Sequence, residues 1–358
     1  SLAIPTTLHA SLLARLDRLA PTREVAQIGA ALGRSFSHEL IAAVAQMPQQ
    51  KLNEALEQLV AAELIFRRGT SPDAEYTFKH ALVQDAAYST MLRSRRQQLH
   101  GLISGKLEAL FPEIVKKQPE VLARHCAEAG LTAKAVGYLL KAAQQSMARS
   151  AMSEAEAQIR QGLELVAAQS ANTEAQQLEL ELQMLLGNVL FATSGYAAPG
   201  VATAFIRARQ LCEKLDRPHD LAVLLSSQSI YHVLAGELNL ANQESEACLA
   251  LARERNDTDL ELVGYSVSTV ARFHIGDFTA ANRDAAQALK LYNPGNPFLS
   301  RFSNDLQANA LIFLFRSQTY LGHLDRARAY RDEALACARQ RIHGHTLVTV
   351  QAISFEAD

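Results

Sequence analysis

The segment Gly276-Asp-Phe-Thr-Ala-Ala-Asn-Arg-Asp-Ala-Ala-Gln-Ala-Leu-Lys-Leu291 has two further copies in the chain and decides the fold class. The copies begin at Gly236-Glu-Leu and Gly322-His-Leu, so successive glycines lie 40 and 46 residues apart. A repeat of this length is typical of stacked helical hairpins. The positions shared by the three copies are small or apolar: Gly236, Gly276 and Gly322; Ala241, Ala281 and Ala327; Leu249, Leu289 and Leu335.

Each shared position has a physical role in a helical hairpin. Glycine ends one helix in a turn, and alanine lets the next helix approach to about 8–10 Å. The leucines pack on that contact from the following turns. Weaker copies start at Gly130 and Ser150, each with alanine five residues later, at Ala135 and Ala155. We therefore expect about five or six hairpins from residue 118 onward.

Helical spacing of apolar residues continues through most of the chain and predicts an all-α protein. The exception is Leu64-Ile-Phe-Arg-Arg68 and Glu75-Tyr-Thr-Phe-Lys79, separated by a turn-forming segment, which predicts a short β-hairpin. Before it, helices are expected at 6–19, 22–32, 37–46 and 49–62, with Ser37 as an N-cap. Helices followed by a two-stranded wing form a winged-helix module. The predicted organisation is a winged-helix module at residues 1–92, a helical linker at 93–117, and a tetratricopeptide-like α-α superhelix at 118–358.

The composition excludes several classes of protein. Of 358 residues 48% are apolar, and 35 Lys and Arg against 37 Asp and Glu leave a net charge of −2. Non-specific nucleic-acid binding, which needs clustered positive charge, is not expected. The predicted helix before the wing carries Lys51 against Glu54 and Glu57, which disfavours contact with DNA phosphates. No apolar run reaches bilayer length and no secretory leader is visible, so we expect a cytoplasmic protein without membrane contact.

The four cysteines form no CxxC pair and are expected to be small buried hydrophobic residues: Cys126, Cys212, Cys248 and Cys337. The chain begins at Ser1 rather than Met and ends at Asp358 within a helical pattern. We therefore expect a piece of a longer protein.

No motif predicts catalysis or a metal site. Gly101-Leu-Ile-Ser-Gly-Lys106 differs from a phosphate-binding loop by one residue in spacing, by Leu107 in place of Ser or Thr, and by its helical setting. His343-Gly-His345 lacks a third metal ligand nearby. No serine lies in a nucleophile-elbow setting. A local basic face is interpreted as solvated helix surface or as a docking site for an acidic patch or nucleotide: Arg93, Arg95, Arg96, His100 and Lys106.

Six further segments carry a family resemblance. They are Ile4-Pro-Thr-Thr-Leu-His-Ala-Ser-Leu-Leu-Ala-Arg-Leu-Asp-Arg-Leu19, Gly29-Ala-Ala-Leu-Gly-Arg-Ser-Phe36, Phe78-Lys-His-Ala-Leu-Val-Gln-Asp-Ala-Ala-Tyr88, Arg96-Gln-Gln-Leu-His100, Pro119-Glu-Val-Leu-Ala-Arg-His125 and Ser194-Gly-Tyr-Ala-Ala-Pro199. Together they resemble the region after the nucleotide-binding core of bacterial STAND-type ATPases, above all those fused to a class III adenylate/guanylate cyclase. The repeats resemble the loose tetratricopeptide-type arm of such proteins.

The resemblance implies a role for one histidine. In that family a histidine after the wing contacts the β-phosphate of ADP, and the matching position is His80. The start of a helix favours anions, which agrees with this role. The alternative is that His80 only caps helix 81–92 or packs in its module. ADP or ATP and Mg²⁺ would belong to ATPase and cyclase domains outside this chain.

The predicted function is regulatory and non-catalytic. The repeat surface would bind a protein or ligand, and the winged-helix part would couple this event to the ATPase core and cyclase. Groove candidates on the first helix of each hairpin are Tyr231, His232, Tyr265, Arg272, Arg316 and Tyr320. Two alternatives are the sensor arm of a STAND-type transcription regulator and a free-standing repeat adaptor.

Overall fold

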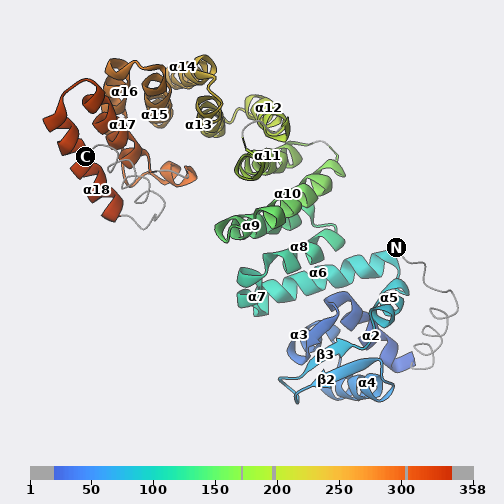
Figure 1. Cartoon of the computed structure of the whole chain (residues 1–358). Helices are drawn as coiled ribbons and strands as arrows, with labels where there is room; N and C mark the ends of the chain where they lie inside the picture. The colour runs from blue at the N-terminus through green and yellow to red at the C-terminus, as the bar shows by residue number, and fades with distance from the viewer. Residues whose placement is uncertain (1–19, 171, 196–198, 303–304, 341–358) are drawn as a thin grey trace. The chain divides into compact units, whose positions relative to one another are not determined.

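The computed structural model describes residues 20–340 apart from 171, 196–198 and 303–304, and the chain divides into two compact units, 1–170 and 171–358. Both units are built almost entirely of helices (Figure 1). The predicted class, an all-α chain of tetratricopeptide-like hairpins with a small β-hairpin, is confirmed. The helix expected at 6–19 and the His343-Gly-His345 pair lie outside the described residues.

The first unit starts with three helices and a small sheet and continues as a run of helices. Its elements are α2 (Ala20–Leu32), β1 (Ser35–Ser37), α3 (His38–Ala45), α4 (Gln49–Ala61), β2 (Ile65–Arg68), β3 (Glu75–Phe78), α5 (Ala81–Ser89), α6 (Arg93–Leu110), α7 (Pro112–Lys117), α8 (Pro119–Glu128), α9 (Thr132–Ala148) and α10 (Met152–Ala167). The predicted linker 93–117 corresponds to α6 and α7. The predicted helix 81–92 ends earlier, at Ser89.

The sheet has three strands rather than the two expected from the sequence. The strands are antiparallel in the order β1-β3-β2, with Phe36 opposite Tyr76 and Arg67 opposite the same tyrosine on the other side. Strand β1 is too short to give a periodic pattern. Ser37 ends it and caps α3, because its hydroxyl accepts a hydrogen bond from the Leu40 amide at 3.1 Å.

One close contact explains why residue 29 is glycine. A Cβ atom on Gly29 would lie 2.7 Å from the ring of Phe36, which is buried at 4% exposure. The ring also stacks on Tyr76, with centroids 5.8 Å apart. Glycine in α2 therefore lets β1 pack directly against the helix backbone.

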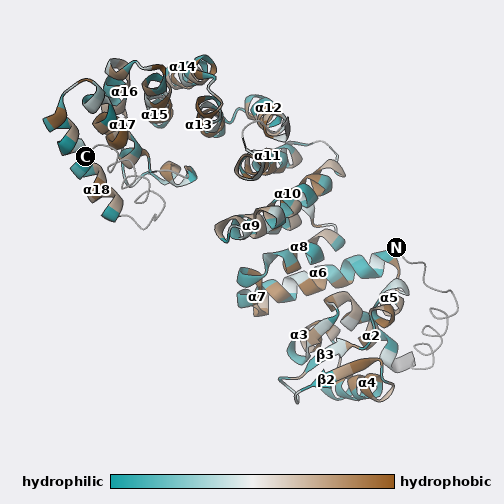
Figure 2. Ribbon diagram, in the orientation of Figure 1, coloured by the Kyte–Doolittle hydropathy of each residue, from teal (hydrophilic) through white to brown (hydrophobic). Residues whose placement is uncertain are grey.

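The second unit is a stack of antiparallel helices. Its elements are α11 (Thr173–Ser194), α12 (Pro199–Lys214), α13 (Pro218–Leu234), α14 (Leu238–Arg255), α15 (Thr258–Ile275), α16 (Phe278–Leu291), the 3₁₀ helix η1 (Pro297–Arg301), α17 (Leu306–Tyr320) and α18 (Leu324–Gln340). Helix α17 is apolar along most of its length (Figure 2), because α15, α16 and α18 all pack against it. The segment that contains η1 lengthens the last repeat to 46 residues. None of the described helices is long and apolar enough to cross a bilayer.

Candidate functional site

Equivalent turns end successive helices in both units. At Gly130, Gly236, Gly276 and Gly322 φ is +76°, +77°, +94° and +81°. The amide of each glycine donates to the carbonyl three residues back, and the following amide donates to the carbonyl five residues back. This is the Schellman arrangement, in which glycine adopts the left-handed conformation without a Cβ clash.

Among the described residues the same pair of hydrogen bonds occurs at four corners without glycine: Glu63, Ser150, Asp216 and Asn256, with φ of +56°, +60°, +49° and +49°. Short polar side chains tolerate this conformation better than other residues do. In the second unit the corners at 216, 236, 256 and 276 therefore follow one another every 20 residues. The repeating element is therefore a single helix with its turn. The glycine positions alone do not show this, because every second corner in this stretch has Asp or Asn instead of glycine.

The small residues of the repeat lie where helices meet. Ala241 and Ala281 are fully buried and Ala327 is 2% exposed. Leu249 of α14 packs on Gly264 of α15 so closely that a Cβ there would lie 2.6 Å from the leucine Cδ2. The remaining two leucines, Leu289 and Leu335, are half-buried around the apolar cluster between α17 and α18.

Two groove candidates, Tyr231 and His232, contact each other and the start of the next helix. Their rings meet edge to face with centroids 5.1 Å apart, and His232 Nδ1 lies 2.8 Å from the Glu237 carboxylate. A third, Tyr265, is half-buried, and burial followed by the charge of Glu261 raises its pKa.

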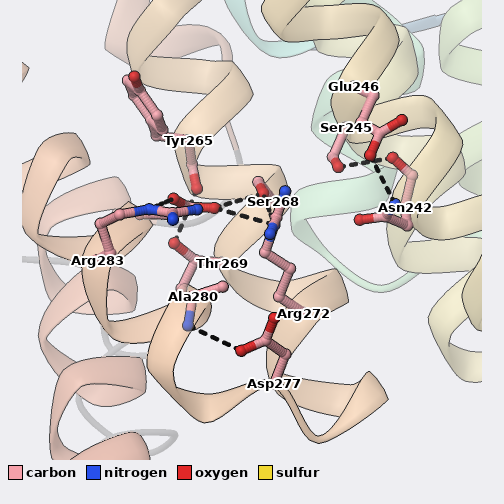
Figure 3. Close-up of polar contacts among 11 residues, drawn as sticks. Asn242, Ser245, Glu246, Tyr265, Ser268, Thr269, Arg272, Asp277, Ala280 and Arg283 are labelled. Atoms are coloured by element: carbon pink, nitrogen blue, oxygen red, sulfur yellow. Dashed lines mark hydrogen bonds and ion pairs between the residues drawn. The ribbon is translucent and has the colours of Figure 1, made fainter.

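Arg272 belongs to a buried ion network between α15 and α16 (Figure 3). Asp284 is 2% exposed, and its Oδ2 accepts a hydrogen bond from the Ser268 hydroxyl at 2.7 Å. Arg272 Nε lies 3.2 Å from the same oxygen, while Arg283 Nε lies 3.0 Å from Oδ1. The guanidinium of Arg272 is therefore engaged in holding two helices together.

Arg316 and Tyr320 share an aromatic cluster, defined here as Phe273, Phe278, Phe313, Arg316 and Tyr320. The Arg316 guanidinium carbon lies 4.4 Å from the centroid of the Phe273 ring and 5.8 Å from that of Phe313. The Tyr320 ring stacks on Phe278, with centroids 4.6 Å apart and planes 8° from parallel. The three phenylalanines could not be grouped from the sequence, because they come from three helices.

His80 lies between β3 and α5, at the position predicted for it. It is the N-cap residue of α5, but its side chain makes no capping hydrogen bond and is exposed. The backbone carbonyl instead accepts the Val83 amide at 3.0 Å. The imidazole is therefore accessible beside a helix N-terminus.

The basic face predicted on α6 is not continuous. Arg95 Nη2 pairs with the Glu24 carboxylate at 3.1 Å. Arg96 donates to the carbonyls of Met91 and Ser89 and lies over the Tyr88 ring. His100 is only 2% exposed, so its inclusion in a surface was wrong: it follows Arg96 by one turn on the same side of α6, but α8 covers the helix at this turn.

His100 instead forms a buried pair with His125 of α8. Their Nδ1 atoms are 2.8 Å apart, so one imidazole donates and the other accepts. The Tyr88 hydroxyl lies 2.9 Å from His100 Nε2 and 3.3 Å from the Glu128 carboxylate. Burial, followed by the Arg124 charge, lowers the pKa of His125 to about 3, and burial also lowers the pKa of His100. No sequence signal marks two histidines 25 residues apart as partners.

Other candidates have structural explanations. Gly101 and Lys106 lie inside helix α6, which has none of the strand-to-turn geometry of a phosphate-binding loop. Three cysteines are buried as expected, and burial raises the pKa of Cys212 to about 11 and that of Cys248 to about 12.

Among the residues that the structure describes, one group of side chains has atoms close enough to hold a metal ion: His219, Asp257 and Asp259. However, Asp257 Oδ1 caps α15 by accepting two backbone amides, and Asp259 Oδ1 accepts the Asn296 side-chain amide at 2.6 Å. The positive end of the α15 dipole at this place opposes a cation. These contacts explain the group without a metal.

No family model matches the chain. An uncharacterized protein of Rhizobium meliloti (strain 1021) is 29% identical over 185 residues, which make up 51% of this chain and 18% of that protein. The chain therefore covers less than a fifth of the length of this curated relative.

Three solved structures are similar at low identity. A STAND protein with a tetratricopeptide repeat sensor from Pyrococcus horikoshii is 12% identical, over 93% of this chain and 52% of that one, with a TM-score of 0.43. Apo RapI is 11% identical (97% and 81%; TM-score 0.48), and aspartyl phosphate phosphatase F from Bacillus subtilis is 13% identical (96% and 97%; TM-score 0.45). At these scores the likeness implies nothing about activity.

Proposed function

We propose that this chain is a non-catalytic interaction and regulatory region whose helical repeats bind a protein partner. The supporting observation is the set of large apolar side chains exposed at the hairpin corners of the second unit: Leu234, Leu240, Ile275, Tyr320 and Leu324, with exposures from 42% to 63%. Apolar side chains gathered on a surface mark interaction sites. Their recurrence at corresponding corners favours an extended partner.

In this proposal residues 1–92 of the first unit are a winged-helix module that senses nucleotide in a neighbouring ATPase core. Helices α2 to α4 followed by the sheet support this architecture. Lys51 and Glu54 on α4 offset each other, and Glu57 pairs with Arg67 of the wing, so DNA contact by α4 is disfavoured. His80 would donate to a β-phosphate, as its exposed imidazole beside a helix N-terminus allows.

The longer protein would carry the ATPase core and an adenylate or guanylate cyclase, which would bind ADP or ATP and Mg²⁺. A STAND-type transcription regulator and a free-standing repeat adaptor are the alternatives. A cyclase domain upstream or a helix-turn-helix domain downstream in the full reading frame would distinguish the first two.

The nucleotide role is tested by ADP retention in the longer protein. His80→Ala should increase the rate of ADP release, because a charge-assisted hydrogen bond is worth about 1.5–3 kcal/mol. Arg68→Ala, at an exposed position of β2, is the matched control. Equal retention in the two variants and the parent would remove the sensor role.

The interaction role is tested by selecting short random peptides on the full chain. Selected peptides should lose binding to the Ile275→Ser/Leu324→Ser variant and keep it when Phe66 of β2, which is also exposed, is changed to Ser. Failure to select any peptide that depends on these corners would contradict the proposal. ATP hydrolysis or cyclic-nucleotide synthesis by the chain alone would contradict its non-catalytic nature.

A further inference from the structure

The aromatic cluster at the α15–α17 contact holds an arginine in a fixed position. Arg316 is half-buried, and its guanidinium lies over the Phe273 ring and near the Phe313 ring, which come from neighbouring helices. Phe273 and Phe313 are themselves packed edge to face at 5.2 Å. Because both rings are buried, the rotamer of Arg316 is fixed before any ligand arrives.

The charge of Arg316 is not used within the part of the second unit that the structure describes. Several other arginines of this unit pair with carboxylates, among them Arg272 and Arg283 with Asp284, and Arg301 with Asp220. For Arg316 the contacts recorded within the described ranges are those with aromatic rings, with no carboxylate at ion-pair distance. A guanidinium that contacts aromatic rings without an ion pair keeps N–H groups available for a bidentate acceptor.

The surroundings of Arg316 select the kind of acceptor. Tyr320 is 63% exposed, and Ile275 at the end of α15 is 46% exposed, so apolar surface adjoins the cation. Asp277 and Asp325 begin the next helices at the same corners, and Asp325 is fully exposed. These carboxylates would repel a polyanion such as nucleic acid, but a single carboxylate next to an apolar side chain fits the arrangement.

We propose that the aromatic cluster binds an acidic and apolar peptide segment of the partner, with an Asp or Glu carboxylate on Arg316 and an apolar side chain against Tyr320. This inference rests on the proposed interaction function and names the chemistry of its ligand. An arginine that lies beside aromatic rings has the composition of a binding hot spot.

The test uses the peptides selected on the full chain. Peptides should be enriched in Asp or Glu next to an aliphatic or aromatic residue, and Arg316→Gln should weaken their binding by about tenfold or more, in line with a charged hydrogen-bonded pair. Arg316→Lys should recover only part, because lysine cannot form the bidentate contact. Arg339→Gln near the far end of α18, which removes an exposed arginine of the same unit, should leave binding unchanged.

The acid in the peptide provides a second measurement that does not depend on the folding of a variant. Replacing its Asp or Glu by Asn or Gln should weaken binding to the parent chain as much as Arg316→Gln does, and should have little further effect on that variant. Selected peptides without acidic enrichment, or equal binding by Arg316→Gln, would overturn the inference while the proposed interaction function stands. Preferential binding of single-stranded oligonucleotide at Arg316 would overturn it in favour of a phosphate ligand.

Discussion

Lowering the pH should destabilise the first unit, because the buried pair His100–His125 must stay neutral in the folded state. The pKa of His125 is about 3 in the fold, against 6.5 for an ordinary histidine. The positive charge of Arg124, on the same helix, lowers the pKa of His125 further. For His100, the charge of Glu128 raises the pKa and that of Arg96 lowers it. Protonation would place a cation 2.8 Å from another imidazole in a buried site.

The sign and size of the effect follow from proton linkage. Between pH 6.5 and about 3 the unfolded chain binds a proton at this residue and the folded chain does not. The free energy of unfolding therefore falls by up to about 1.4 kcal/mol per pH unit as the pH decreases, which gives about 2 kcal/mol at about pH 5. The depressed pKa of His100 acts in the same direction.

Hydrogen–deuterium exchange of the α6 and α8 amides, combined with urea unfolding at a series of pH values, measures this effect within the first unit. His125→Gln should lower stability near neutral pH and reduce the slope of unfolding free energy against pH. Leu122→Ala on the same helix should lower stability by about 2–5 kcal/mol at every pH and keep the parent slope. An identical slope in His125→Gln and the parent would refute the reasoning.

Three further changes can be measured by urea unfolding followed by circular dichroism. Gly276→Ala should lower the free energy of unfolding by about 1–2 kcal/mol, because φ is +94° there even though the space around the residue is open. Gly137→Ala, in α9 with equally open space, should be neutral or stabilising by up to about 1 kcal/mol. Asp284→Asn should cost about 3 kcal/mol or more, because Arg272 would lose its buried partner. Gly264→Ala should cost about 1–3 kcal/mol by overpacking against Leu249. Equal changes in stability for Gly276→Ala and Gly137→Ala would contradict the role of φ. An unchanged stability of Asp284→Asn would contradict the role of the buried charge, and an unchanged stability of Gly264→Ala would contradict the role of the close contact.

The sequence predicted those features that depend on local backbone chemistry. Ser37 caps α3, and the residues on either side of the 69–73 turn form β2 and β3. Strand β1 was missed because three residues carry no periodicity, and its pairing with β3 is decided by a partner 40 residues away in the chain. The corners at Asp216 and Asn256 were missed because glycine is the strongest, but not the sole, signal for a left-handed turn.

Side-chain partnerships across helices could not be predicted from the sequence. The helical period placed Arg272 and Arg316 on the first helices of their hairpins, yet Arg272 is neutralised by Asp284 and Arg316 lies over the ring of Phe273. Likewise, His100 belongs to a buried pair rather than to the basic face assigned to it.

What the sequence by itself determined is the succession of helices and turns, because backbone conformation depends on neighbours a few residues away. Only the tertiary structure decided which charges are paired, which histidines are buried and which arginine packs on aromatic rings. Those properties depend on side chains from separate helices that meet only after the helices pack, so their electrostatics cannot be obtained from the order of residues alone.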